Sequence, residues 1–259
     1  PCPSVVSGTE TFEYSGSIVQ FTVPDCVTTL NIEAFGAQGG DADTSTGGLG
    51  ARIKGDFEVT PGDVFQVLVG QQGIAGTNTT TEAGGTGGGG SFVVLDTTPL
   101  LVAGGGGGAN RYSNVDGGPG QTDTAGQSGT GNYAGTAGTD GGGGTPCLTG
   151  GFHGGTGGGG FSGDGSGNSV GTATNGTPNQ PGLAFLNGGN GGIGGTLGRD
   201  GGFGGGGSSG FSGGGGGGYT VSGNVATHGG GGGGSFNAGT NPEAEAGVRE
   251  GNGRVVITW

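Results

Sequence analysis

Residues 87–108 read GGGGSFVVLDTTPLLVAGGGGG and contain both kinds of sequence of which the chain is made. Two apolar segments, Phe92–Leu95 and Leu100–Ala103, flank the turn residues Asp96–Pro99, a pattern typical of a β-hairpin. Glycine runs stand directly before and after this hairpin. The stretch therefore predicts β-strands that lead straight into segments with almost no side chains.

Glycine dominates the composition. Of the 259 residues 81 are glycine, against an average share of roughly 7%. Collagen is also rich in glycine, but it has a strict Gly-X-Y period and abundant proline, whereas this chain has 10 prolines and glycine runs of four to six. Apolar residues concentrate in residues 1–103 and 247–259. The glycine-rich residues 104–246 are therefore expected to form a separate part, inserted between strands.

The apolar parts carry strand patterns. Alternation of apolar and polar residues or short apolar runs predict strands within residues 9–36, 51–59, 64–69, 92–103 and 254–259. Because the first and last of these lie far apart in the sequence, a sandwich that contains both is a jelly-roll-like arrangement. We therefore expect an all-β, jelly-roll β-sandwich from residues 1–103 plus 247–259. Ala244–Arg249 is expected to hold one helical turn at most.

The middle of the chain, residues 104–246, is either disordered or ordered in a form that needs glycine. Glycine loses the most backbone entropy on folding, which favours disorder. Aromatic residues closely follow several glycine runs, however, and the runs recur with apolar spacers between them. Polyproline-II-type helices without side chains can pack closely and hydrogen-bond to one another through N–H and C=O groups. We favour this ordered bundle of polyglycine helices.

The charge balance limits the classes of partner. Six basic residues face 19 acidic ones, so the net charge is −13. Nucleic-acid binding needs a basic footprint, and an anionic membrane surface repels such a chain. There is also no run of 18 apolar residues. We expect no nucleic-acid partner and no membrane insertion. The opening Pro1-Cys2-Pro3 fits a processed N-terminus, and we expect an extracellular location.

Because the chain has three cysteines, at least one of them has no disulfide partner within it. Cys2 and Cys26 flank the first expected strands and could pair, and three buried thiols are the alternative. Cys147 has no plausible partner in the sequence and is a structural or leftover thiol.

No motif for catalysis, cofactor or metal binding is present. His153 and His228 lack zinc-type spacing, and Ser166 lies between glycines without the strand and helix of a nucleophile elbow. Asp41-Ala42-Asp43 comes closest to a calcium loop, and solvated acidic loops explain it better. We therefore expect no enzyme, no cofactor and no metal site.

Several short motifs, in this order, resemble the extracellular glycine-rich region of the anaplastic lymphoma kinase and leukocyte tyrosine kinase receptors, and similar regions of bacterial secreted proteins. They are Phe35–Gly40, Leu68–Gly73, Gly87–Val94, Pro99–Ala103 with the five glycines after it, Gly201–Gly204, Gly213–Tyr219 and Glu250–Val255. The resemblance implies a tumour-necrosis-factor-like β-sandwich joined to a bundle of polyglycine helices. In the receptors this region binds a small protein ligand.

Three functions are compatible with these patterns. The first is a secreted, non-catalytic structural protein that self-assembles as a homo-oligomer or polymer into an extracellular fibre or adhesive surface layer. The alternative is an extracellular binding module for a protein ligand or a surface glycan, and ice binding is a lesser alternative. For a binding module, the contact aromatics to test are Phe161, Phe203, Phe211 and Tyr219, which could equally plug the seam between bundle and sandwich.

Overall fold

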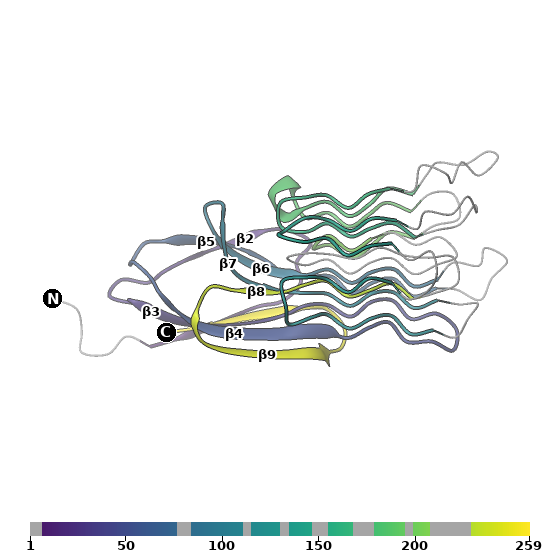
Figure 1. Cartoon of the computed structure of the whole chain (residues 1–259). Helices are drawn as coiled ribbons and strands as arrows, with labels where there is room; N and C mark the ends of the chain where they lie inside the picture. Colours follow the sequence, from purple (N-terminus) through teal and green to yellow (C-terminus); the bar gives the residue numbers. More distant parts are fainter. Residues whose placement is uncertain are drawn as a thin grey trace.

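The protein is all-β, with two antiparallel sheets of five strands each (Figure 1). The computed structural model describes residues 7–76, 84–110, 115–129, 135–146, 155–167, 179–194, 199–207 and 229–259. Within these ranges the only helical element is a 3-10 turn, η1 (Phe185–Asn187). The described part of the chain holds no helix with the length and apolar character that a membrane span needs.

The first sheet joins the two ends of the sequence. Its strand order is β1 (Thr9–Phe12), β10 (Arg254–Thr258), β3 (Thr29–Phe35), β4 (Gly50–Glu58) and β9 (Thr240–Arg249). The closing strand β10 lies between β1 and β3, with Val255 opposite Ala34. Along β3 and β4 buried and less buried residues alternate, because one face of this sheet packs inward and the other meets solvent.

The second sheet contains the hairpin on which the sequence argument began. Its order is β2 (Val19–Thr22), β5 (Val64–Leu68), β6 (Ser91–Leu95), β7 (Thr98–Ala103) and β8 (Phe236–Asn237). The predicted hairpin is confirmed: β6 and β7 pair, with Leu95 opposite Thr98 and Asp96 at a positive φ of 56°. The turn is shorter than expected, because Thr98 and Pro99 already belong to β7.

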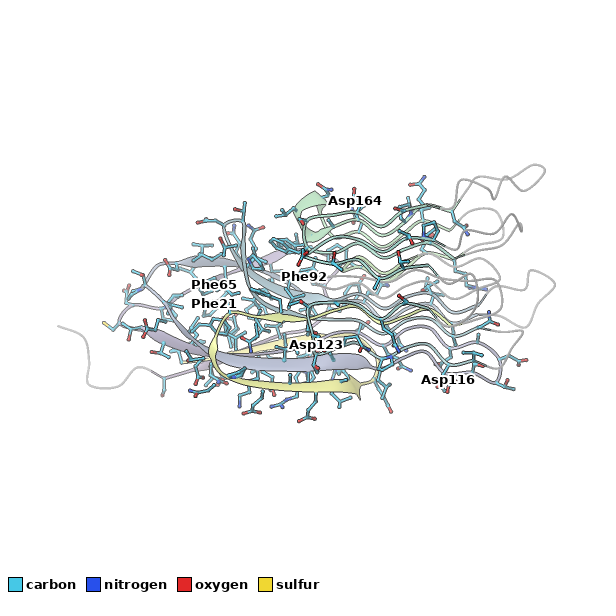
Figure 2. All side chains as sticks on the ribbon, in the orientation of Figure 1. Phe21, Phe65, Phe92, Asp116, Asp123 and Asp164 are labelled. Carbon is cyan, nitrogen blue, oxygen red and sulfur yellow. The ribbon has the colours of Figure 1, made fainter. Side chains whose placement is uncertain are left out.

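The hydrophobic core lies between the two sheets (Figure 2). Phe21 and Phe65 stack there with ring centroids 6.2 Å apart, and Phe21 also contacts the single tryptophan, Trp259, at 5.6 Å. Inward-facing residues of both sheets complete the core: Leu30, Ile32, Ile53, Val67, Val93, Leu101, Val255 and Ile257. These are the alternate residues of the predicted strands, so the period of two seen in the sequence is the pattern that builds the core.

Two strands were not expected. β8 and β9 lie in residues 236–249, where the sequence predicted the end of the glycine-rich part and at most one helical turn. Thr240–Ala246 are all exposed, so β9 shows no apolar alternation. Ion pairs accompany its backbone pairing with β4: Arg52 of β4 contacts Glu243 at 2.9 Å and Glu245 at 3.1 Å. The same side chain also contacts Glu33 of β3 at 2.5 Å. Cross-strand charge pairs stabilise a sheet, but a sequence does not show which strands meet.

Acid is expected to weaken the attachment of β9. The hydrogen bond from Arg52 lowers the pKa of Glu243, and hydrogen bonds from Asn241 and Asn31 lower that of Asp56. Since these pKa values lie below the ordinary values of 4.5 and 3.8, the two carboxylates stabilise the fold above that range. Their contribution is lost as the pH falls through the lowered pKa values. The urea midpoint of Trp259 fluorescence, measured at pH 7 and pH 3, should therefore drop less in Glu243→Gln than in the wild type.

Glu10→Gln is the matched control for this experiment, because it removes one negative charge from the other edge strand of the same sheet. It shows how much the loss of one negative charge alone changes the urea midpoint at each pH. Equal pH dependence in Glu243→Gln and the wild type would contradict a role of this carboxylate in holding β9.

The remaining segments continue beyond the ends of the strands as extended rows that run side by side (Figure 1). We call them the glycine layer, which comprises residues 36–49, 70–76, 84–90, 104–110, 115–129, 135–146, 155–167, 179–194, 199–207 and 229–235. Rows from before residue 104 belong to the layer together with later ones, since Gly48 donates to Gly107 and Gly88 to Gly106. The layer is thus built from the connections between strands.

The row at 104–109 shows how the layer packs. A Cβ placed on successive glycines would overlap the carbonyl oxygens of different rows in turn: Gly104 and Gly107 face Gly233 and Gly230, Gly105 and Gly108 face Gly88 and Gly85, and Gly106 faces Gly48. The hydrogen bonds repeat at the same interval, because Gly106 donates to Ala37 at 2.8 Å and Ala109 to Gly40 at 2.9 Å. Contacts therefore recur every three residues. On each side of the row, a neighbouring backbone lies too close for a side chain to fit.

Candidate binding groove

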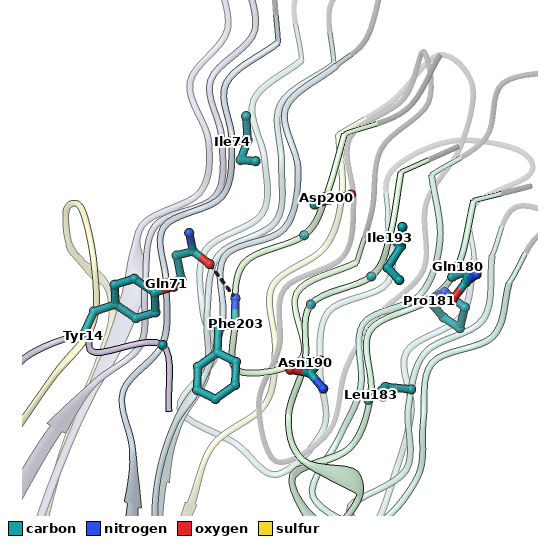
Figure 3. A pocket seen from close by; sticks show the side chains of 14 residues that line it. Tyr14, Gln71, Ile74, Gln180, Pro181, Leu183, Asn190, Ile193, Asp200 and Phe203 are labelled. Atoms are coloured by element: carbon teal, nitrogen blue, oxygen red, sulfur yellow. Dashed lines mark hydrogen bonds between the residues drawn. The ribbon is translucent and has the colours of Figure 1, made fainter. Parts of the chain in front are cut away.

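A groove of about 620 Å³ opens on the glycine layer where four of its rows lie side by side (Figure 3). Each row contributes a polar residue and, three positions later, an apolar one. The pairs are Gln71 and Ile74, Gln180 and Leu183, Asn190 and Ile193, and Asp200 and Phe203. The groove is thus lined by the same two-residue pattern four times over.

The pairs share a sequence pattern, polar–x–Gly–apolar. It reads QQGI at 71–74, QPGL at 180–183, NGGI at 190–193 and DGGF at 200–203. In an extended row that repeats every three residues, the first and fourth positions share one face, so both side chains reach the groove. In three of the four segments the glycine in the third position faces inward: a Cβ on Gly73, Gly182 or Gly202 would overlap the backbone of Thr86, Gly205 or Gln71. Local sequence therefore determines which face each row presents.

Backbone hydrogen bonds hold the four rows in order. Gln71 N–H donates to the carbonyl of Phe203, and Gly201 N–H donates to Gly192, both at 2.8 Å. The row at 180–183 is fastened to the row at 190–193 in the same way, by the N–H groups of Gln180 and Leu183, which donate to Ile193 and Asn190 at 2.8 Å. The floor of the groove is consequently a hydrogen-bonded surface that is fixed before any ligand arrives.

Two aromatic rings form one wall. Tyr14, from the segment between β1 and β2, lies beside Phe203 with ring centroids 6.4 Å apart and planes tilted by 54°. The side-chain oxygen of Gln71 accepts the N–H of Phe203 at 3.1 Å, which fixes this amide at the foot of the wall (Figure 3). Ile74 and Ile193 leave 39% and 55% of their surface exposed. Apolar area is therefore available to a ligand along the groove.

The electrostatics of the groove are simple. Among the described residues that line it there is no lysine, arginine or histidine, and Asp200 is the single carboxylate. Its Oδ1 accepts the N–H of Gly194 at 2.7 Å. Acid–base hydrolysis of a glycoside normally needs two carboxyl groups, and phosphate recognition needs cations or converging N–H groups. The lining offers hydrogen bonds and apolar contact, which suit binding.

The structure separates the four aromatics named from the sequence. Phe203 lines the groove, whereas Phe161 is buried, with 7% of its surface exposed, and stacks on Phe185 at 5.7 Å. Phe161 therefore packs inside the protein and is not available to a ligand. Phe211 and Tyr219 lie outside the described residues.

The other sequence candidates are accounted for as follows. Cys26 is disulfide-bonded, and Cys2 and Cys147 both lie outside the described residues, as do His153 and His228. Asp41 Oδ1 accepts the N–H of Gly47 at 2.8 Å. Within the described ranges, no three His, Cys, Asp or Glu side chains gather as metal ligands would.

Sequence reasoning missed the groove, although its signal was present. The four polar–x–Gly–apolar segments are visible in the sequence. The glycine runs around them, however, indicate close backbone packing and not a ligand site. Tyr14 carried no signal, because only the fold brings it next to Phe203.

The comparisons with known proteins add no family. Neither a scan of the sequence against protein-family models nor a search among curated proteins finds a match. The resemblance to the receptor glycine-rich regions therefore stays a prediction.

Proposed function

We propose that the chain is an extracellular, non-catalytic binding module and that its ligand lies in the groove on the glycine layer. The observation that carries the proposal is the fourfold repeat of polar and apolar side chains on one pre-formed, hydrogen-bonded surface. Concave sites of 300–1,000 Å³ with apolar lining and a few placed polar groups are the usual form of a ligand site. A volume of about 620 Å³ falls in this range.

The disulfide of Cys26 supports the extracellular location, since disulfides persist in oxidising compartments. The lining itself supports binding without catalysis, because the described residues that line the groove include no second carboxylate and no lysine, arginine or histidine beside Asp200.

We also propose that the fold is a jelly-roll, tumour-necrosis-factor-like sandwich joined to a bundle of polyglycine helices. Strands that are neighbours in a sheet but distant in sequence, such as β1 with β10 and β4 with β9, support the first part. The three-residue repeat of contacts along residues 104–109 supports the second, because a polyproline-II-type helix has three residues per turn.

Self-assembly into a fibre or surface layer is the second candidate. The exposed edge strand β9, ten residues long, favours it as a place where another chain could pair. The same strand carries Pro242, the acidic residues Glu243 and Glu245, and breaks in register, all of which obstruct pairing at an edge. The other edges, β1, β2 and β8, have two to four residues. We therefore place binding before assembly.

A two-panel binding experiment tests the proposal. The purified chain is immobilised and probed by biolayer interferometry with soluble polysaccharides and, separately, with purified extracellular-matrix proteins. We expect a probe to bind and Phe203→Ala to weaken it about tenfold or more, since covering an aromatic ring is worth about 1.5–3 kcal/mol. Leu186→Ala is the matched control, because Leu186 is 46% exposed on the same layer outside the groove.

Binding that Phe203→Ala and Leu186→Ala weaken equally would contradict the groove as the site. The absence of binding to every probe of both panels would overturn the proposed function and leave assembly, which sedimentation and electron microscopy then measure as large, regular particles.

A further inference from the structure

We propose that the ligand is a neutral polysaccharide, bound as an extended chain that crosses the rows of the groove. This inference rests on the proposed function, and it adds the chemical class of the ligand. It follows from what the lining side chains can do, from their charge, and from the backbone groups that the rows have already used.

The lining offers both the apolar surface and the hydrogen-bonding groups that match a sugar ring. A pyranose has apolar C–H faces and a rim of hydroxyl groups that both donate and accept hydrogen bonds. Phe203, Tyr14 and Ile193 supply apolar surface for the faces. The amides of Gln71 and Asn190 carry both donors and acceptors, which suits hydroxyl groups. Gln71 lies beside Phe203, and Asn190 beside Leu183, so polar and apolar residues also alternate from one row to the next and each sugar unit can meet both kinds.

Charge selects a neutral ligand. The described lining contains no cation, and its one formal charge is the carboxylate of Asp200. The whole chain has a net charge of −13. Uronic-acid polymers, sulfated glycans and phosphates would be repelled both at the site and at long range. A neutral chain meets no such repulsion.

The backbone argues against a peptide. Extended peptides usually bind by adding a strand to free N–H and C=O groups of an edge. Here the N–H groups of Gln71, Gln180, Leu183, Gly201 and Phe203 already donate to neighbouring rows or to a side chain, at 2.8–3.1 Å. The floor of the groove therefore offers side chains rather than a backbone ladder.

The dimensions favour a chain over a single sugar. The polar and apolar members of a pair are three residues apart, which is about 9 Å along a polyproline-II-type row. Four rows repeat this spacing of a polar and an apolar side chain along a groove of about 620 Å³. A surface of this extent is comparable to several linked sugar units.

Affinity electrophoresis of the folded chain tests the inference. The gels contain laminarin, glucomannan or xyloglucan as neutral polymers, and alginate or polygalacturonate as acidic ones. We expect at least one neutral polymer to retard the wild type, and neither acidic polymer to do so. Phe203→Ala and Asn190→Leu should weaken the retardation, by about tenfold for the aromatic ring. Asn190 is exposed, so its variant is expected to fold even if Phe203→Ala does not.

A control variant outside the groove completes the design. Leu186→Ala should bind the neutral polymer as the wild type does. Circular dichroism confirms that each variant is folded before its mobility is compared.

The outcomes separate this inference from the proposed function. Retardation by a neutral polymer that is lost in the Asn190 and Phe203 variants supports both. No retardation by any neutral polymer, or retardation by the acidic ones alone, overturns the inference. If an extracellular protein then binds the groove in the two-panel experiment, the proposed function stands without it. If nothing binds in either experiment, both fail.

Discussion

Gly106→Ala is expected to destabilise the protein by more than about 3 kcal/mol, a large share of the roughly 5–15 kcal/mol by which a domain is stable. A single methyl group has this effect because the space that it would occupy is already filled by a neighbouring backbone. A Cβ on Gly106 would overlap the carbonyl carbon and oxygen of Gly48. Backbone groups cannot rotate aside as a flexible side chain can.

The neighbouring row is also unable to move away. Gly48 donates to Gly107 at 2.8 Å, and its carbonyl accepts the N–H of Gly39 at 2.9 Å. A shift that makes room for the methyl group would break bonds to two rows at once, and unsatisfied buried backbone groups are costly. The strain therefore spreads through the layer instead of relaxing locally.

Urea unfolding, followed by Trp259 fluorescence, measures the effect. Gly167→Ala is the matched control, since Gly167 is exposed and its added Cβ would meet Pro181 Cδ at 3.3 Å and the Asn179 carbonyl at 3.5 Å. Replacing glycine by alanine also restricts the unfolded chain, which favours the folded state by about 0.4–1 kcal/mol where the site tolerates it. A Gly106→Ala midpoint equal to that of Gly167→Ala would contradict the close packing of the rows.

The sheets were far easier to predict from the sequence than the layer beside them. The alternation in β3 and β4 and the apolar runs of β5 to β7 follow directly from burial on one face or on two. In contrast, β9 has exposed residues and a partner nearly two hundred positions away, so nothing local distinguishes it from a loop. The glycine rows carry no side-chain pattern that specifies their neighbours.

The candidate site shows the same limit in another form. The polar–x–Gly–apolar segments show which side chains share a face, because that depends on three consecutive residues of one row. Which rows become neighbours depends on hydrogen bonds between glycines that are chemically identical. The adjacency of the segments at 71–74 and 200–203 could therefore be found only from the structure.

Phe92→Ala is expected to cost about 3–5 kcal/mol, the usual range for removing a buried phenylalanine ring. Phe92 is 1% exposed and lies on the outer face of the second sheet, where its ring contacts Phe185 of the glycine layer at 5.2 Å. Its cluster joins Leu68, Val94 and Val102 of the sheet with Phe161 and Phe185 of the layer. This contact explains why β6 is apolar on both faces.

The same substitution tests whether sheets and layer unfold together. Strands run straight into rows, β3 into 36–40 and β7 into 104–109, and the hydrogen bond from Gly253 to Gly70 ties the β9–β10 connection to a row at the junction. We therefore expect one transition, in which Trp259 fluorescence and the hydrogen exchange of residues 155–165 shift to the same lower midpoint.

Phe185→Ala, which removes the ring on the other side of the contact, provides the comparison. Because the two rings touch, the double variant should lose less stability than the sum of the two single variants. Exchange that rises in residues 155–165 while Trp259 keeps its wild-type midpoint would mean that the layer opens by itself. The groove would then lie on a surface that forms and melts independently of the sheets, rather than on one that the hydrophobic core holds in place.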